Sequence, residues 1–151
     1  MATDGSTGDG LRVGVVAVQG DVAEHREAMD RAAASRDLAV ETLAVRDGGV
    51  LPSCDVAVLP GGESTTISSL IHREGIAEEI AAHVEEGKPV LATCAGLIVL
   101  AREVDDDRVE ALGVLDVAVE RNAYGRQRES FEADVALDLD GDDGGSETGF
   151  H

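Results

Sequence analysis

Short apolar runs of strand length alternate along this chain with segments in which apolar residues recur at helical spacing. The runs lie at residues 12–18, 38–44, 56–59, 90–93, 114–119 and 131–139, and the predicted helices lie at 22–33, 64–73, 76–84 and 95–102. Strands that alternate with helices favour a parallel sheet, because each crossover helix packs back onto a face of the sheet. The sequence therefore predicts an α/β fold with an open, mostly parallel sheet covered by helices on both faces.

The two ends of the chain differ in composition from the segments between them. Residues 1–10 are rich in Gly, Ser, Thr and Asp, which predicts a flexible acidic leader before an ordered domain at 11–151. Residues 140–151 are again rich in Gly and Asp, and natural domains seldom end in such a segment, so we expect a chain that breaks off within its fold. The leader has no secretory pattern, and the longest apolar stretch, 89–101, is too short to span a bilayer. We therefore expect a cytoplasmic protein.

Acidic residues outnumber basic ones by 31 to 12, which gives a formal net charge of −19. A field of this sign repels phosphate backbones and anionic lipids, so neither nucleic acid nor a membrane is an expected partner. Small domains commonly carry a net charge of about 2 to 8 in magnitude, and the excess here favours a halophile over an ordinary acidic cytosolic protein. Two cysteines without zinc-type spacing provide no evidence for a metal site.

The strongest local signal is a cysteine at the junction of a predicted strand and a predicted helix. Cys94 is flanked two residues away by Ala92 and Gly96, in the segment Val-Leu-Ala-Thr-Cys-Ala-Gly-Leu. This pattern is typical of a nucleophile elbow, in which a strained turn exposes the nucleophile and small neighbours allow close packing. A helix N-terminus also favours the thiolate. The alternative is a buried structural cysteine.

Two further segments carry polar groups suited to a site. Residues 60–66, Pro-Gly-Gly-Glu-Ser-Thr-Thr, follow a predicted strand at the edge where open parallel sheets bind ligands. Their amides are suited to stabilise an oxyanion with the N–H of Ala95; a phosphate cradle, which lacks its lysine here, and a plain turn are the alternatives. In residues 120–127 Arg121 is a candidate carboxylate clamp, the alternative being a surface loop whose arginines pair with acids.

Taken in order, these segments resemble one family: the glutaminase subunits of pyridoxal 5'-phosphate synthase, PdxT, which are class I glutamine amidotransferases with a flavodoxin-like fold. The resemblance rests on residues 15–25, 59–66, 93–98 and 121–132. It implies that Cys94 attacks the side-chain amide of L-glutamine and forms a thioester that water hydrolyses to L-glutamate, while ammonia passes to the PdxS synthase subunit. It further implies that no cofactor or metal is needed.

The resemblance also assigns roles to the loops. Gly62 and Ala95 would supply the oxyanion-hole amides, Gly62, Glu63 and Ser64 would contact the substrate, and Arg121 would hold the α-carboxylate side of glutamine. Gln19 and Gly20 would lie in a loop near the site and near the partner contact.

Two departures from the family pattern change what we expect of this chain. The smaller is Ala92, where the family usually has glycine. The larger is that no His-x-Glu pair, which would supply the general base and its orienter, follows Cys94. His25, His72 and His83 lie in predicted helices, where solvated faces are expected, and His151 is the last residue.

The resemblance therefore implies that the last strands and helix of the domain are missing. We expect this chain to be inactive alone and to fold poorly, because its sheet keeps an unpaired edge. The alternatives are a non-catalytic remnant that docks on the synthase and a cysteine-elbow protein of the PfpI group. Against the second stand residues 61–66 and 121–127, which that group has no reason to carry.

Overall fold

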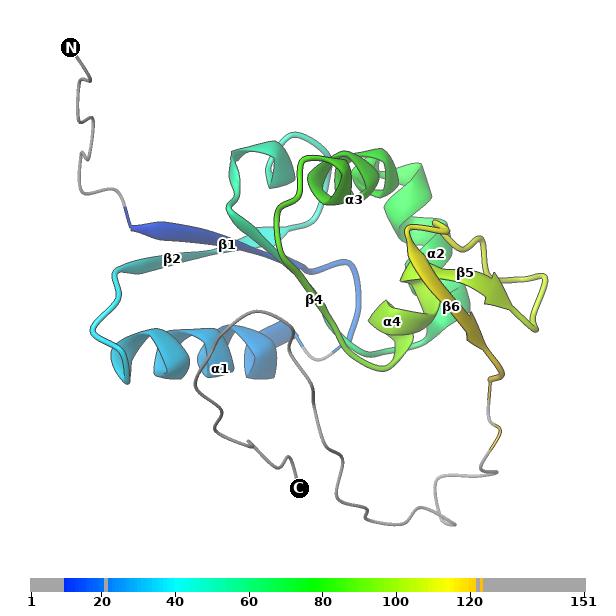
Figure 1. Cartoon of the computed structure of the whole chain (residues 1–151), viewed down its shortest axis with the longest axis horizontal. Coiled ribbons are helices and arrows are strands. Elements are labelled where there is room, and N and C mark those ends of the chain that lie inside the picture. Colours follow the sequence, from blue (N-terminus) through cyan, green and yellow to red (C-terminus); the bar gives the residue numbers. More distant parts are fainter. Residues whose placement is uncertain (1–9, 21, 122, 124–151) are drawn as a thin grey trace. The chain divides into compact units, whose positions relative to one another are not determined.

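Four parallel strands form the main sheet of the protein, as a computed structural model that describes residues 10–20, 22–121 and 123 shows (Figure 1). The strands are β1 (Leu11–Val16), β2 (Val40–Val45), β3 (Val56–Leu59) and β4 (Val90–Ala92), in the order β2-β1-β3-β4. All three strand pairs are parallel. The predicted parallel α/β sheet is therefore confirmed, with strand bounds that differ from the expected ones by up to two residues. The predicted leader, apart from Gly10, and the predicted strand at 131–139 lie outside the described residues.

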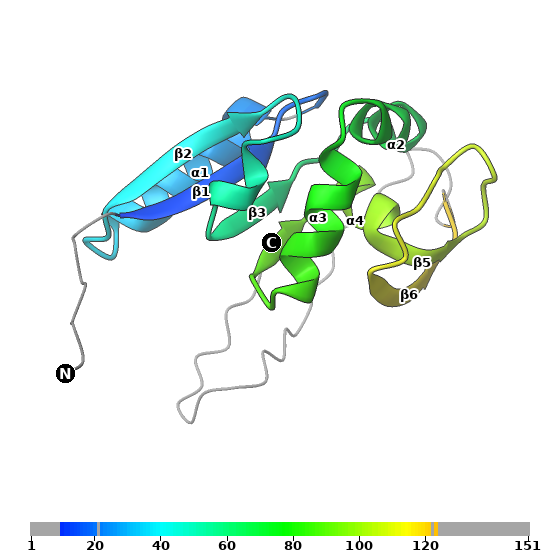
Figure 2. The same ribbon diagram turned by 90° about the horizontal axis from the view of Figure 1, so that it is seen from above.

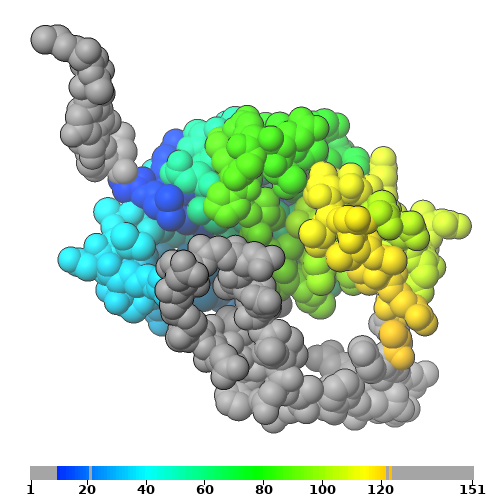
Figure 3. All heavy atoms as spheres, viewed as in Figure 1, coloured from blue at the N-terminus to red at the C-terminus, as the bar shows by residue number. Residues whose placement is uncertain are grey.

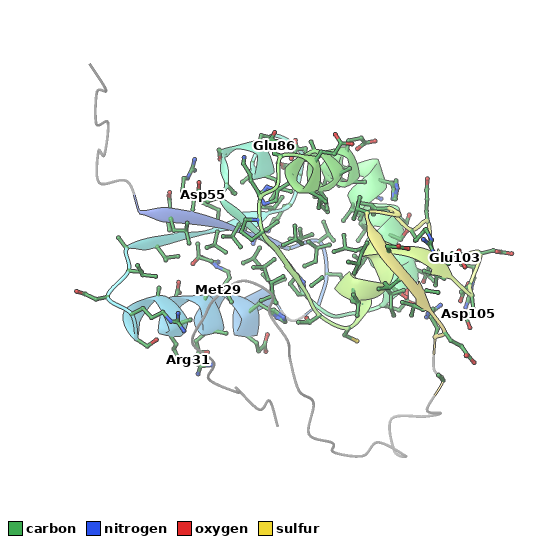
Figure 4. All side chains as sticks on the ribbon, viewed as in Figure 1. Met29, Arg31, Asp55, Glu86, Glu103 and Asp105 are labelled. Atoms are coloured by element: carbon green, nitrogen blue, oxygen red, sulfur yellow. The ribbon has the colours of Figure 1, made fainter. Side chains whose placement is uncertain are left out.

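Helix α1 (Val22–Ala34) covers one face of this sheet. Side chains alternate between the two faces of a strand, so that Val13 and Val15 of β1 and Val58 of β3 point to the same side, where they form a buried cluster. Met29 of α1 packs on this cluster, and Figure 4 shows it on the sheet side of the helix, with Arg31 on the opposite side. The alternation thus explains how one apolar stripe of α1 anchors the helix.

The opposite face of the sheet carries the larger core. Here lie α2 (Ser64–Arg73), α3 (Ile76–Glu85), α4 (Ala95–Leu100) and the short 3-10 helix η1 (Leu51–Ser53) (Figure 2). Fully buried side chains from the sheet and from these helices make one cluster, which includes Val16, Val45, Leu59, Ile71, Ile80 and Val99. Helices therefore cover both faces of the sheet, as the sequence predicts.

A second, two-stranded parallel sheet follows α4. It pairs β5 (Ala101–Val104) with β6 (Leu115–Val119). The sequence-based prediction of a helix through residue 102 is wrong at its end, because Ala101 adopts an extended conformation (φ −59°, ψ 153°). The loop before β6 explains this: Leu112 N–H donates to the carbonyl of Val99 (2.8 Å) and Gly113 N–H to that of Ala101 (3.1 Å), which satisfies carbonyls at the helix end.

Helix α3 packs on the larger core and lies at the surface of the protein (Figure 3). One residue on it corrects an expectation: His83 is not on a solvated face but 3% exposed, with Nε2 3.2 Å from the carbonyl of Pro89. The reason is that position 83 follows Ile76 and Ile80 on the buried side of the helix. None of the helices within the described ranges is long and apolar enough to cross a membrane.

Candidate active site

The segments that follow β1, β3 and β4 meet at the carboxyl edge of the main sheet. Thr93, just after β4, donates its N–H to the carbonyl of Leu59 at the end of β3 (3.1 Å). The β1 segment lies against the β3 segment, since a Cβ atom added to Gly20 would lie 1.8 Å from the carbonyl oxygen of Gly61. The side-chain oxygen of Gln19 accepts the N–H of Glu63 (2.9 Å). Apart from Arg121, which follows β6 of the second sheet, the predicted site residues therefore come from neighbouring strand ends of one edge.

Cys94 occupies a sharp turn between β4 and α4. Its backbone has φ 50° and ψ −115°, a conformation that residues other than glycine rarely adopt and that costs on the order of 1–3 kcal/mol. The cysteine is exposed, whereas Ala95 and Gly96 are buried. A Cβ atom on Gly96 would lie 2.3 Å from the carbonyl oxygen of Leu59, so the turn requires glycine there. An exposed thiol on a strained turn contradicts the alternative of a buried structural cysteine.

Cys54 is the structural thiol of the chain. It is 1% exposed, belongs to the larger core, and has a sulfur that would lie 2.9 Å from a Cβ atom on Gly14. Burial raises the pKa of the Cys54 thiol. The two cysteines of the chain thus have opposite environments, and Cys94 is the one a reagent or substrate can reach.

The loop after β3 presents backbone to the same edge. Gly62 has φ +149°, and a Cβ atom there would lie 3.0 Å from Cδ1 of Ile67 and 3.1 Å from the side-chain oxygen of Gln19. Glycine thus lets this loop turn in close contact with the segment after β1. The structure brings Gly62 and Ala95 to neighbouring strand ends, and their role as oxyanion donors stays a prediction.

Glu63 begins α2 as its N-cap. Its carboxylate accepts hydrogen bonds from the Thr65 hydroxyl, from the Thr66 N–H (2.8 Å) and from the Thr66 hydroxyl (2.9 Å). These bonds, the one from Thr65 first among them, lower the pKa of Glu63 to about 2. The next residue, Ser64, is 3% exposed. The loop therefore carries a negative charge at neutral pH, whereas the Ser64 side chain is largely shielded from solvent.

Arg121 is held by carboxylates on two sides. Its guanidinium contacts Asp106 and lies 3.5 Å from Glu63, and the side chain is 18% exposed. Its backbone N–H donates to the side chain of Asp105 (2.8 Å). Hydrogen bonds from Arg108 and the charge of Arg121 hold the pKa of Asp106 well below its usual range. Arg121 thus pairs with acidic residues, and its role as a carboxylate clamp stays a prediction. The same contacts place its positive charge beside the loop after β3.

One contact at this edge involves a residue for which the sequence predicted no role. Nε2 of His25, in α1, lies 2.9 Å from the hydroxyl oxygen of Thr93, the residue before Cys94. The expectation of a solvated helix face is therefore wrong for His25, which is half-buried. Strand alternation supplies the missing signal, because Leu91 pairs with Val58 and residue 93 therefore shares the face that α1 covers.

Within the described ranges, His, Cys, Asp and Glu side chains form no group of three that is suited to hold a metal ion. The polar groups at the edge are instead a thiol, carboxylates, a guanidinium and backbone amides. Such a set suits nucleophilic attack on a carbonyl group with stabilisation of the resulting oxyanion.

Comparisons with known proteins agree with this chemistry. Residues 15–144 match the family model of the SNO glutamine amidotransferases. A pyridoxal 5'-phosphate synthase subunit PdxT from Haloarcula marismortui is 66% identical over 131 residues, which are 87% of this chain and 66% of the relative. The PdxT subunit from Halorubrum lacusprofundi is 61% identical over 84% of this chain and 64% of its own length.

A solved structure shares the fold. A crystal structure of a glutamine amidotransferase superposes with a TM-score of 0.69 at 46% identity, over 81% of this chain and 62% of the other. The chain thus spans 62–66% of the length of these proteins.

Proposed function

The chain belongs to the SNO glutamine amidotransferase family, and from this membership we propose that it forms the main part of a glutaminase subunit of pyridoxal 5'-phosphate synthase. The reaction would be hydrolysis of L-glutamine to L-glutamate and ammonia in the cytoplasm. The observation that carries the proposal is the exposed Cys94 thiol on a strained turn beside the Gly-Gly-Glu-Ser loop.

The chemistry assigned to Cys94 proceeds through a covalent intermediate. Its sulfur attacks the side-chain amide carbon of glutamine and forms a tetrahedral oxyanion. Collapse of this species breaks the C–N bond, and the nitrogen leaves as ammonia after it takes up a proton. Water then attacks the thioester, releases glutamate and restores the thiol. Amides of Gly62 and Ala95 are assigned to the oxyanion, because Ala95 directly follows Cys94 and Gly62 lies in the loop after the adjacent strand β3.

The substrate's charged end is assigned to the loop after β3 and to Arg121. The ionised Glu63 attracts the α-ammonium group of glutamine, and Arg121 attracts its α-carboxylate. Ser64 follows Glu63 in the chain and is assigned to the same contact with the substrate. Because the guanidinium already contacts Asp106, the glutamine carboxylate would share Arg121 with that side chain or replace it.

The general base is not among the residues of the predicted site. No His-x-Glu pair follows Cys94 in these 151 residues, and we propose that they cannot turn over glutamine by themselves. We propose that the ammonia passes to the synthase subunit PdxS, the partner of this chain, which uses it to assemble pyridoxal 5'-phosphate. Neither a metal nor a cofactor is assigned to the glutaminase step.

The test is release of glutamate from glutamine in about 2 M KCl, a concentration at which surface charges are strongly screened. Four samples are compared: residues 1–151, the same residues with added synthase subunit, a chain extended with the C-terminal third of a haloarchaeal relative, and the Cys94→Ala variant of that extended chain. We expect activity in the extended chain, its loss in the extended Cys94→Ala variant, and none in residues 1–151.

Two results would change this account. Cys94-dependent activity in residues 1–151 would show that a residue of this chain or of the partner supplies the base. An extended chain that folds and binds the synthase subunit but releases no glutamate would contradict the proposed reaction.

A further inference from the structure

We propose that His25 is a positioning residue for the nucleophile: through the hydroxyl group of Thr93 it fixes the turn that presents the Cys94 thiol. The role concerns the reactivity of the thiol, so that it can be tested whether or not glutamine is the substrate.

The turn at Cys94 needs to be held from both sides. Its φ of 50° is unfavourable for a residue with a Cβ atom, so the chain would relax if its neighbours were free to move. On the C-terminal side Gly96 packs against Leu59, and Ile98 N–H donates to the carbonyl of Cys94 (3.1 Å). These contacts fix the first turn of α4.

On the N-terminal side Thr93 connects the strand to the turn. Its N–H donates to the carbonyl of Leu59 (3.1 Å), and its own carbonyl accepts from Gly96 N–H (2.9 Å). Its side chain lies on the α1 face, where the hydroxyl oxygen is 2.9 Å from Nε2 of His25. Backbone and side chain of Thr93 are thus tied to different elements.

The pairing of imidazole with hydroxyl suits this purpose. A threonine hydroxyl can donate to an unprotonated Nε2 or accept from a protonated one, so the contact persists in either tautomer of the ring. Threonine is also stiff about χ1, because its Cβ carries two heavy atoms. Once the hydroxyl is held, the backbone of residue 93 has little freedom left, and the direction in which residue 94 leaves the strand is set.

Without this contact Cys94 is expected to relax toward a common backbone conformation. The thiol would then spend less time above the edge of the sheet, where it is exposed. His25→Ala and Thr93→Val should each slow alkylation of Cys94 by about threefold or more, the size expected for loss of one hydrogen bond. The double variant should be no slower than the slower single variant, because both changes remove the same contact.

The experiment measures the rate of Cys94 alkylation by iodoacetamide in residues 1–151 in about 2 M KCl, by mass spectrometry of the Cys94 peptide. Buried Cys54 reports any unfolding in the same sample. Two conservative variants test the chemistry: His25→Gln keeps a donor and acceptor near the position of Nε2, and Thr93→Ser keeps the hydroxyl. Both should react within about twofold of the parent chain. Glu24→Gln, an exposed change on the same helix, is the matched control.

A purely structural role would give another pattern. The proposal is wrong if, in the double variant, the effects of the two single changes on the alkylation rate add up. It is also wrong if His25→Gln reacts as slowly as His25→Ala while both keep the melting temperature of the parent chain. Should His25→Ala not fold, Thr93→Val is sufficient, because valine keeps the shape of threonine. Alkylation of folded Thr93→Val at the parent rate would likewise overturn the proposal.

Discussion

Gly96 has no room for a larger side chain, because a Cβ atom there would lie 2.3 Å from the backbone carbonyl of Leu59. We expect Gly96→Ala to lower the free energy of unfolding by about 2 kcal/mol or more, although alanine is ordinarily the better helix former. Gly75→Ala is the matched control: Gly75 has φ 74° but open space around it, and about 1 kcal/mol is expected there. Urea unfolding of both variants measures the two losses in free energy of unfolding. Equal losses would contradict the close contact at Gly96.

The charge on Glu63 stabilises the folded chain in a pH-dependent way. Hydrogen bonds lower its folded pKa to about 2 from a usual value near 4.5, so its contribution is fully present above about pH 4.5 and is lost as the pH falls toward 2. Because the side chain is half exposed, we expect Glu63→Gln to cost only about 0.5–1 kcal/mol at pH 7.

The difference in free energy of unfolding between the parent chain and Glu63→Gln should shrink steadily from pH 5 toward pH 2. Glu85→Gln, which removes one exposed carboxylate at the end of α3, is the matched control. A difference between Glu63→Gln and the parent chain that stays constant over this range would contradict the hydrogen-bonded carboxylate.

Single residues at the site differ in how far the sequence foretold them. The strained turn at Cys94 follows from a local rule, since a buried strand that runs into a helix with small flanking residues has few other conformations. The His25 contact joins positions 68 residues apart, and local patterns carry no distance information of that kind. The partners of Arg121 were foreseen only as a class, because acidic residues occur in many segments of the chain.

Elements with strong boundary signals were predicted closely, and those that depend on distant partners were not. Helix α2 begins and ends at the predicted residues, because Glu63 caps it and Gly75 allows the chain to turn after it. The end of α4 was missed, because the residues that satisfy its carbonyls and the strand that pairs with β5 come later in the chain. Apolar residues suit a short helix and a strand alike, so that tertiary pairing decides between them.

Strand β4 is expected to promote self-association of residues 1–151. It pairs with β3 on one side, no described strand lies on the other, and Leu91 on its α1-facing side is 44% exposed. We expect Leu91→Lys to lower the average mass in light scattering more than Leu38→Lys, which adds the same charge at a 55% exposed position outside the strands. Equal effects of the two changes would exclude the edge as the cause.

At the scale of the whole molecule the net charge of −19 dominates the response to salt. Self-repulsion opposes the compact state, and at molar salt the screening length falls to about 3 Å. We expect the melting temperature to rise by several degrees as KCl increases from about 0.1 to 2 M, with most of the gain early in the titration. KCl is preferred to sulfate, which also strengthens apolar burial. A melting temperature that falls or does not change would contradict a charge-limited fold.

The origin of close relatives in haloarchaea agrees with the halophile that composition predicts. The parallel sheet and its two helical faces were also foreseen, since hydrophobic patterning alone defines them. The remaining third of the relatives' length has no counterpart in these residues.

We propose above that Cys94 is the nucleophile of a glutamine site. The most direct measurement is covalent labelling of residues 1–151 with 6-diazo-5-oxo-L-norleucine, a reactive glutamine analogue, followed by mass spectrometry of the peptides. We expect one adduct, on Cys94, that glutamine suppresses and glutamate suppresses less, with Cys54 unlabelled. A folded chain that takes up no label, or one in which excess glutamine leaves the labelling of Cys94 unchanged, would contradict it.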